Sequence, residues 1–234
     1  MAVHQQPSSA VSADLVYTDD LTGLRNRRFL YQVFGEGWSE IADSGRELSL
    51  AIVDLDYFKQ VNDTHGHLTG DLVLAETASL LQGFLAEEDH AIRYGGDEFV
   101  LLLPKRSKAE SQDLVERLRR TMADKEFVSK EENQPLEVVL SFSIGVATYP
   151  EDGTSGEELM AAADKALYAS KKAGRNCVTM SGALPAGLED EIDKFRTFPC
   201  KTLVGRQEVI ETLAGQCELV NLGTGTWTAL WGPA

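Results

Sequence analysis

The stretch Leu48–Val53 is apolar at nearly every position, and it constrains the fold more than any other feature of this 234-residue chain. A short apolar run of this kind predicts a central strand that is buried on both faces of a sheet. Apolar residues at helical spacing predict a helix before this strand, over 26–42, and another after it, over 69–85. The first part of the chain therefore alternates helical and strand signals.

Two glycines, Gly95 and Gly96, separate two strand-like runs at 91–94 and 99–103. A tight type I′ turn needs positive φ at both central positions, so the pair predicts a β-hairpin. Beyond the hairpin, Gly145 is expected to bend a strand or strand pair. The elements expected there are a charged helix over 108–123, this strand region over 136–149, a helix over 156–173 and a last strand over 177–180.

The charge balance excludes two classes of partner. The chain has 22 Lys and Arg against 37 Asp and Glu, a formal net charge of −15. Nucleic acids and anionic membranes both attract a basic surface, so we expect neither as a partner. A small phosphate-bearing ligand needs only a local basic pocket, and it stays possible.

The cysteines and the apolar runs indicate where the protein works. Three widely spaced cysteines predict neither a disulfide framework nor a zinc site, and they suit a reducing compartment. The apolar runs are strand-sized, far short of the ~20 residues that a spanning helix needs, and the N-terminus does not resemble a signal peptide. We therefore expect a cytoplasmic protein.

Two acidic segments carry candidate chemistry. Asp54 to Lys59 (DLDYFK) follows the buried strand, and carboxylates with a lysine at a strand end can hold a hard cation and a phosphate together. Asp97 and Glu98 lie at the tip of the expected hairpin. If the hairpin pairs beside the central strand, Asp97 and Asp54 meet, and a Mg²⁺ between them would relieve their repulsion. The alternatives are a solvated loop and an ordinary acidic turn.

Two further groups are ambiguous when taken alone. Lys171 and Arg175 lie about one turn apart near a helix end, where cations also interact favourably with the helix dipole. The segment 62–71 (NDTHGHLTGD) reads as a polar loop before a helix, which Thr69 or Asp71 could cap. Its two histidines lack a third nitrogen or sulfur ligand nearby in sequence and do not predict a transition-metal site.

In this order and spacing, five motifs closely resemble the GGDEF domain of bacterial diguanylate cyclases. The resemblance implies an α/β (α+β) nucleotidyl-cyclase-like fold, with a central, mostly antiparallel five-stranded sheet surrounded by helices. It also implies an enzyme that joins two GTP into cyclic di-GMP and two pyrophosphates, with Mg²⁺ (or Mn²⁺) as cofactor, across a homodimer. The motifs are DDLTGLRNRR (19–28), DLDYFKQVNDTHGHLTGD (54–71), RYGGDEF (93–99), SIGVATYP (143–150) and ADKALYASKKAGRN (163–176).

The same resemblance assigns roles to individual residues. It implies that Asp54 and Asp97 ligate the metal with the Leu55 carbonyl, and that Glu98 serves a second metal or the activation of the ribose 3′-hydroxyl. Catalysis would then rest on Asp54, Asp97 and Glu98. The substrate-binding set that it implies is the phosphate cradle of Phe58, Lys59, Lys171 and Arg175, and the guanine readers Asn62 and Asp71 with His67.

Many relatives carry an inhibitory Arg-x-x-Asp site for the product, and this chain departs from it. The matching residues are Ala86, Glu87, Glu88 and Asp89, so the aspartate is kept while alanine replaces the arginine. Without a guanidinium, and with added negative charge, we expect weak or absent product inhibition. Two other readings stay open, namely a catalytically silent module that senses GTP or cyclic di-GMP, and a pure interaction module.

The domain boundaries follow from these motifs. We expect a disordered lead over 1–14, the GGDEF domain over 15–180 and a linker over 181–201. Residues 202–234 resemble the start of a P-loop ATPase domain, which stops before a phosphate-binding Gly-Lys-Ser/Thr. The alternative is an ordinary C-terminal extension that packs on the cyclase domain.

Overall fold

The computed structural model describes residues 15–128, 135–136 and 138–183 of the chain. The chain divides into two units, residues 1–189 and 190–234, and all described residues belong to the first. The predicted lead over 1–14, the predicted linker beyond residue 183 and the predicted ATPase start over 202–234 lie outside the described residues. No helix in the described part is long and apolar enough to cross a membrane.

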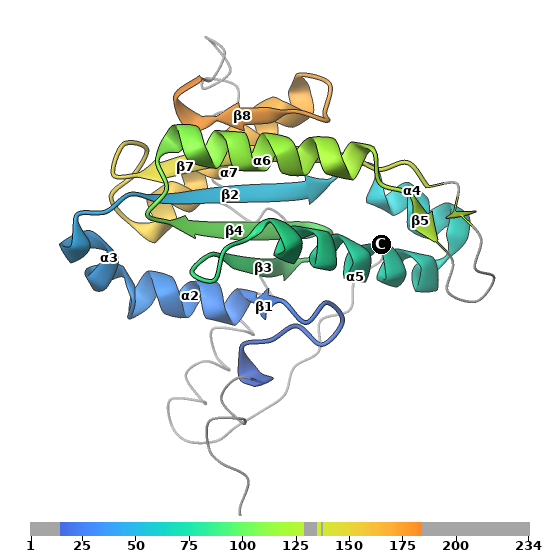
Figure 1. The fold of residues 1–234 in the computed structure, drawn as a ribbon, viewed down its shortest axis with the longest axis horizontal. Coiled ribbons are helices and arrows are strands. Elements are labelled where there is room, and N and C mark those ends of the chain that lie inside the picture. Colours follow the sequence, from blue (N-terminus) through green and yellow to red (C-terminus); the bar gives the residue numbers. More distant parts are fainter. Residues whose placement is uncertain (1–14, 129–134, 137, 184–234) are drawn as a thin grey trace, which may run out of the picture. The chain divides into compact units, whose positions relative to one another are not determined.

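In the described residues, six strands form one sheet in the order β1-β3-β4-β2-β7-β8 (Figure 1). The inner strands pair antiparallel, whereas β1 on β3 and β8 on β7 pair parallel at the two edges. The strands are β1 Arg25–Asn26, β2 Leu48–Leu55, β3 His90–Gly95, β4 Glu98–Pro104, β7 Phe142–Tyr149 and β8 Val178–Met180. A separate two-stranded sheet joins β5 Phe127–Val128 to β6 Pro135–Leu136.

The expected fold class is confirmed, with six strands in the main sheet in place of five. The strand that the sequence pattern did not indicate is β1, whose two residues are too few to show alternation. The region 136–149 resolves into one eight-residue strand, β7, with β6 belonging to the other sheet.

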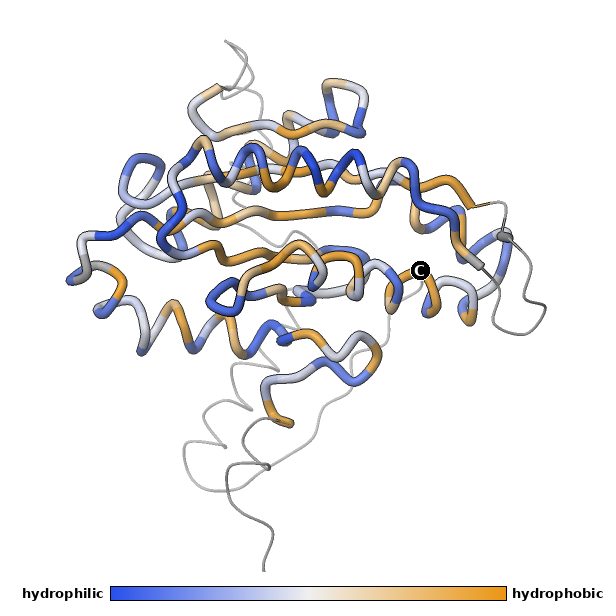
Figure 2. The backbone as a smooth tube through the Cα atoms, viewed as in Figure 1, coloured by the Kyte–Doolittle hydropathy of each residue, from blue (hydrophilic) through white to orange (hydrophobic). Residues whose placement is uncertain are grey.

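Helices cover both faces of the sheet. On one face lie α4 Phe58–His65, α5 His67–Phe84 and α6 Lys108–Ala123, and on the other lie α2 Arg27–Gly35, α3 Trp38–Ser44 and α7 Gly156–Lys172. A short 3₁₀ turn, η1 Ser181–Ala183, ends the described chain. Along α6, hydrophilic and hydrophobic residues alternate, as expected for a helix that covers a sheet (Figure 2).

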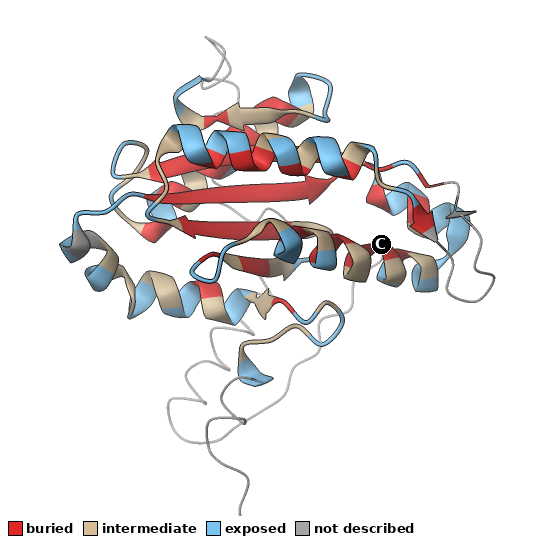
Figure 3. Cartoon of the chain, viewed as in Figure 1, coloured by how far each residue is buried: buried red, intermediate tan, exposed pale blue. Residues whose placement is uncertain are grey.

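The strand β2 lies at the centre of this arrangement, and all eight of its residues are buried (Figure 3). Its side chains alternate between two hydrophobic clusters. Val53 and Leu55 pack with α4, α5 and α6, whereas Leu50 and Ile52 pack with α2 and α7. The expectation of a strand that is buried on both faces is therefore confirmed.

Gly145, the expected bend, lies inside β7, whose pairing with β2 runs through it without a register shift, and it allows close contact with α7. A Cβ at this position would lie 2.1 Å from both the Ala163 carbonyl oxygen and the Leu167 amide nitrogen. Only a residue without a side chain lets the helix backbone come this near to the strand. The glycine therefore fixes the distance between α7 and the sheet.

Two expected elements take a different form. The helix expected over 26–42 is split into α2 and α3, since Gly35 and Gly37 weaken it at the break. Asn26 caps α2, because its side chain accepts hydrogen bonds from the Arg28 and Phe29 amides.

The polar segment 62–71 is largely helical, and only Gly66 separates α4 from α5. Neither Thr69 nor Asp71 caps α5, whose N-cap is Gly66.

The hairpin between β3 and β4 exists, but its turn is centred one residue later than expected. Gly95 pairs with Glu98, so Gly96 and Asp97 are the central residues. Of the two, only Gly96 has positive φ, at 56°. A β-bulge between Arg93 and Gly95 takes up the extra residue.

Candidate active site

Asp54 lies near the C-terminal end of β2, where the sheet register sets it opposite Glu98 on β4 and Ser143 on β7. Its side chain is 11% exposed, and Lys171 Nζ donates a hydrogen bond to its Oδ2 at 2.7 Å. Burial raises the pKa of Asp54, Lys171 opposes this shift, and the charges of Asp97 and Asp56 add to it. Asp54 is therefore a carboxylate that depends on a nearby cation.

Asp97 and Glu98 reach the same end of the sheet through the β3–β4 turn. The Leu55 amide donates to the Asp97 carbonyl at 3.3 Å, which ties the turn to the end of β2. Burial raises the pKa of Glu98, and the neighbouring Asp54 charge raises it further. Two strand ends thus bring Asp54, Asp97 and Glu98 to the same end of the sheet, where the sequence led us to expect Asp54 and Asp97 if the hairpin paired beside the central strand.

The acidic side chains at this end of the sheet do not form a complete metal site by themselves. Within the described ranges, no three His, Cys, Asp or Glu side chains are gathered closely enough to hold a metal ion. Mg²⁺ is commonly bound by one or two carboxylates, with substrate phosphates and water completing its shell. The oxygen-only donors Asp54 and Asp97 fit that pattern.

Two of the three cations of the expected phosphate cradle, Lys171 and Arg175, come from the end of α7. Lys171 lies in its last turn and is held by Asp54. Arg175 follows the helix, with its guanidinium carbon 5.0 Å from the centroid of the Tyr57 ring. A side chain that the sequence did not single out, Tyr57, thus supports Arg175 through a cation–π contact.

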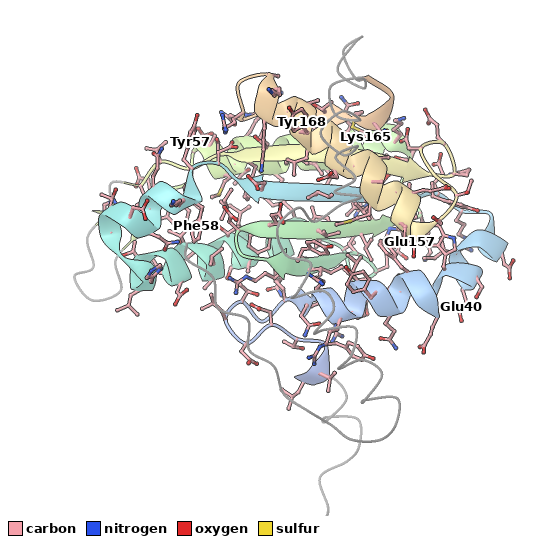
Figure 4. All side chains as sticks on the ribbon, turned by 180° about the vertical axis from the view of Figure 1, so that it is seen from behind. Glu40, Tyr57, Phe58, Glu157, Lys165 and Tyr168 are labelled. Atoms are coloured by element: carbon pink, nitrogen blue, oxygen red, sulfur yellow. The ribbon has the colours of Figure 1, made fainter. Side chains whose placement is uncertain are left out.

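The start of α4 lies beside Arg175 and supplies backbone amides. Tyr57 precedes the helix with φ at 62°, and no side chain caps this end. Tyr57 is 54% exposed and faces outward, whereas Phe58 is buried toward α5 (Figure 4). Lys59 is exposed. An uncapped helix N-terminus with nearby cations is a favourable place for phosphate.

The expected base readers form a separate group along α4 and α5. Asn62 lies on α4 and is partly buried, while His67 and Asp71 are exposed on α5. A Cβ on Gly70 would lie 2.0 Å from Asn62 Oδ1. Because Gly70 has no side chain, there is room for the Asn62 carboxamide against α5 at the position directly before Asp71.

Arg93 lies in this region, and sequence reasoning assigned it no role. Its Nε and Nη2 donate to the Gly96 carbonyl at 3.2 and 3.0 Å, and its Nη1 forms an ion pair with Asp19 at 3.2 Å. Arg93 thus joins the N-terminal turn to the turn that carries Asp97. Its place in the RYGGDEF motif was the available signal.

The degenerate inhibitory motif forms a tight turn after α5, and its aspartate is engaged internally. The Asp89 side chain is fully buried, and it accepts from Arg106 Nη2 at 2.6 Å, from Arg106 Nε at 3.2 Å and from the Ala86 amide at 2.9 Å. Glu88 pairs with Lys105 on the surface. A cavity of about 470 Å³ lies beside this turn, and its lining includes Ala86 and Asp89 but none of the three acids of the site.

Comparison with known proteins identifies one family. The family described as "Diguanylate cyclase, GGDEF domain" matches residues 16–177. Diguanylate cyclase A of Treponema denticola is 35% identical over 171 residues, which cover 72% of this chain and 45% of that protein. The response regulator PleD of Caulobacter vibrioides is 36% identical over 172 residues, covering 74% of this chain and 37% of PleD.

Solved structures agree with this result. The GGDEF domain of DgcB from Caulobacter crescentus, determined in complex with c-di-GMP, superposes with a TM-score of 0.67 at 33% identity. That match covers 78% of this chain and 99% of the DgcB domain. In contrast, the chain spans less than half the length of the two curated relatives.

Proposed function

Because the chain belongs to the GGDEF family of diguanylate cyclases, we propose that it condenses two GTP molecules into cyclic di-GMP and two pyrophosphates. Each ribose 3′-oxygen attacks the α-phosphorus of the other GTP. At each centre a new P–O bond forms, the bond to pyrophosphate breaks and the hydroxyl proton is lost. Since each domain holds one GTP, two copies of the chain must face each other, and the active form is a homodimer.

The observation that supports this proposal most strongly is the meeting of Asp54, Asp97 and Glu98 beside Lys171. Asp54 and Glu98 lie opposite each other in the sheet; the charge of Asp97 raises the pKa of Asp54, and the charge of Asp54 raises the pKa of Glu98. Acids that lie close together and repel one another are costly to maintain without a function, since each disfavours the ionisation of the next. We assign Asp54, Asp97 and Glu98 to the reacting end of GTP.

The donors present fit Mg²⁺ or Mn²⁺. All are oxygens, from the side chains of Asp54, Asp97 and Glu98 and from the Leu55 carbonyl, and hard divalent cations prefer such ligands. When bound, a divalent ion would neutralise triphosphate charge and lower the pKa of the 3′-hydroxyl. The chain's own part is to hold the carboxylates on two adjoining strand ends, so that the nucleotide meets them in a fixed orientation.

The remaining site residues bind the two ends of the nucleotide. Lys59, Lys171, Arg175 and the amides at the start of α4 would hold the phosphates. Asn62 and Asp71, with His67 nearby, would read guanine. A carboxylate can accept from both N1–H and N2–H₂ of guanine, and adenine lacks this donor pair, so Asp71 favours GTP over ATP.

Product inhibition is expected to be weak or absent. The retained Asp89 already receives the guanidinium of Arg106 and the amide of Ala86, so its oxygens are not free for cyclic di-GMP. Alanine at position 86 removes the arginine that would pair with phosphate.

We place the protein in the cytoplasm, where GTP is available.

The test is incubation of the full chain with Mg²⁺ and GTP, followed by chromatography of the products. We expect cyclic di-GMP and pyrophosphate in a ratio of one to two, with a rate per molecule that rises with protein concentration. Binding of GTP without any product, even at high protein concentration, would favour a silent sensor. Removal of divalent ions by a chelator should stop the reaction reversibly.

Matched variants separate the site from the rest of the fold. Glu98→Gln and Asp54→Asn remove one negative charge each while keeping the shape of the side chain, and both should abolish product formation. Asp113→Asn makes the same change at a side chain that is 72% exposed on α6, and it should leave the rate unchanged. Full activity of Glu98→Gln would contradict the site assignment.

A further inference from the structure

The chain that follows α7 adopts an unusual conformation. Three successive residues, Gly174, Arg175 and Asn176, have positive φ, at 112°, 65° and 47°. Glycine adopts such angles freely, whereas a side chain at Cβ disfavours them. Two non-glycine residues in a row therefore need support from the surrounding structure.

Asp56, the residue after β2, provides much of that support. The Asn176 amide donates to Asp56 Oδ2 at 3.1 Å, and Arg175 Nε lies 3.9 Å from Asp56 Oδ1. The hydroxyls of Ser141 and Ser143 donate to the two carboxylate oxygens at 2.6 and 2.7 Å. The Asp56 side chain is fully buried, so these internal donors surround it.

Further contacts fix the same turn. The Arg175 amide donates to the Ser170 carbonyl at 3.1 Å, and Asn176 Oδ1 accepts from Arg119 on α6 at 2.7 Å. The turn is thus anchored to α7 and α6, and also to Asp56, which directly precedes Tyr57 in the chain. Tyr57 is the N-cap of α4, and the Arg175 guanidinium lies over its ring. Asp56 is therefore bonded to the turn that carries Arg175 and is the chain neighbour of Tyr57, the two partners of this cation–π contact.

We infer that Asp56 is a positioning residue, which sets the Arg175 guanidinium beside the start of α4 for the phosphates of the nucleotide. The inference rests on the proposed function and deepens it, since it names a buried residue that decides phosphate binding without touching the substrate. With its oxygens occupied by two hydroxyls and one amide, Asp56 acts through Arg175.

The test uses two probes that differ in the phosphates. 3′-Deoxy-GTP carries the triphosphate but cannot cyclise, and guanosine carries only the base and sugar. Binding of each to the full chain is measured with Mg²⁺ present by titration calorimetry. In Asp56→Asn, an amide group replaces one acceptor oxygen that faces internal donors. We expect the affinity for 3′-deoxy-GTP to fall about tenfold or more, as for a lost hydrogen bond to a charged group, and the affinity for guanosine to stay unchanged.

A double-mutant cycle shows whether the effect passes through Arg175. Arg175→Gln should weaken 3′-deoxy-GTP binding, and adding Asp56→Asn to it should weaken binding little more. Additive losses would overturn the inference, as would equal losses for 3′-deoxy-GTP and guanosine or unchanged binding in Asp56→Asn. If Asp56→Asn does not fold, Ser141→Ala removes one supporting hydroxyl and should give a smaller loss that is again confined to 3′-deoxy-GTP. Failure of the wild-type chain to bind 3′-deoxy-GTP would refute the proposed function itself, which is a distinct outcome.

Discussion

Replacing Gly145 by alanine tests the claim that this glycine sets the distance between α7 and the sheet. The added Cβ would lie 2.1 Å from two backbone atoms of α7, while ordinary van der Waals contact begins at 3.4 Å. The helix must therefore retreat by about 1.3 Å, the difference between these distances. Backbone atoms cannot move aside as the end of a flexible side chain can.

The energetic cost follows from the packing that this retreat disturbs. Leu167 and Ala163 lie in the hydrophobic cluster between α7 and the sheet, and they are 3% and 0% exposed. A gap of about 1 Å forfeits a quarter to a half of the dispersion energy of each atom pair that it separates. We expect Gly145→Ala to lose about 3 kcal/mol of unfolding free energy, at the upper end of overpacking effects. Typical domains have only about 5–15 kcal/mol in total.

Urea denaturation followed by far-UV circular dichroism measures this loss. With a urea dependence of about 2 kcal/mol per molar, the midpoint should fall by roughly 1.5 M. Gly83→Ala on α5 is the matched control, because a Cβ there meets no atom within 4 Å. It should stabilise the protein by about 0.5–1 kcal/mol, since alanine restricts the unfolded chain. A midpoint for Gly145→Ala equal to that of the wild type would refute the reasoning.

Three further changes have defined outcomes. Asp89→Ala removes the buried partner of Arg106, whose side chain is partly exposed, so we expect a loss of about 2–3 kcal/mol in urea and no change in a cyclic di-GMP inhibition curve. If inhibition were tight and this variant abolished it, Asp89 would be a product ligand after all. Ser107→Ala removes the capping box of α6 and should cost about 1 kcal/mol by the same denaturation assay. Burial, assisted by Arg25, lowers the pKa of His90 from 6.5, so its unfolded form binds protons more readily. The contribution of His90 to the unfolding free energy should be complete above pH 6.5 and should be lost as the pH drops through the lowered pKa. In thermal melts between about pH 7 and pH 5, the melting temperature of His90→Gln should therefore fall less than that of the wild type.

The sequence predicted well those elements whose residues repeat with a clear period. The buried strand β2 was expected from its apolar run, and α6 was expected as a charged helix with the bounds it has, Lys108–Ala123. The helix α4 was missed because its residues are mostly polar, and only Phe58 and Val61 are buried in it. Local pattern does not reveal a helix that is held by so few apolar contacts.

Contacts between distant segments were the other limit of sequence reasoning. The motifs indicated that Asp54, Asp97 and Glu98 meet, through resemblance to a family and through the expected pairing of two strands. Nothing local indicated the partners of Asp56, which lie 85 to 120 residues further along the chain. The pairing of Arg106 with Asp89 was hidden likewise, because neither residue belongs to a periodic pattern that would place the two side by side.

The burial of β2 implies that the two sides of the proposed site differ in local stability. Amide hydrogens of β2, which is buried throughout and paired on both sides, should exchange with solvent only when the whole domain unfolds. The turn at 174–176 has little regular pairing and lies after a helix end, so its amides should exchange through smaller, local openings. The strand end that carries Asp54 is then the most protected part of the proposed site, and the turn that carries Arg175 is the part that opens first.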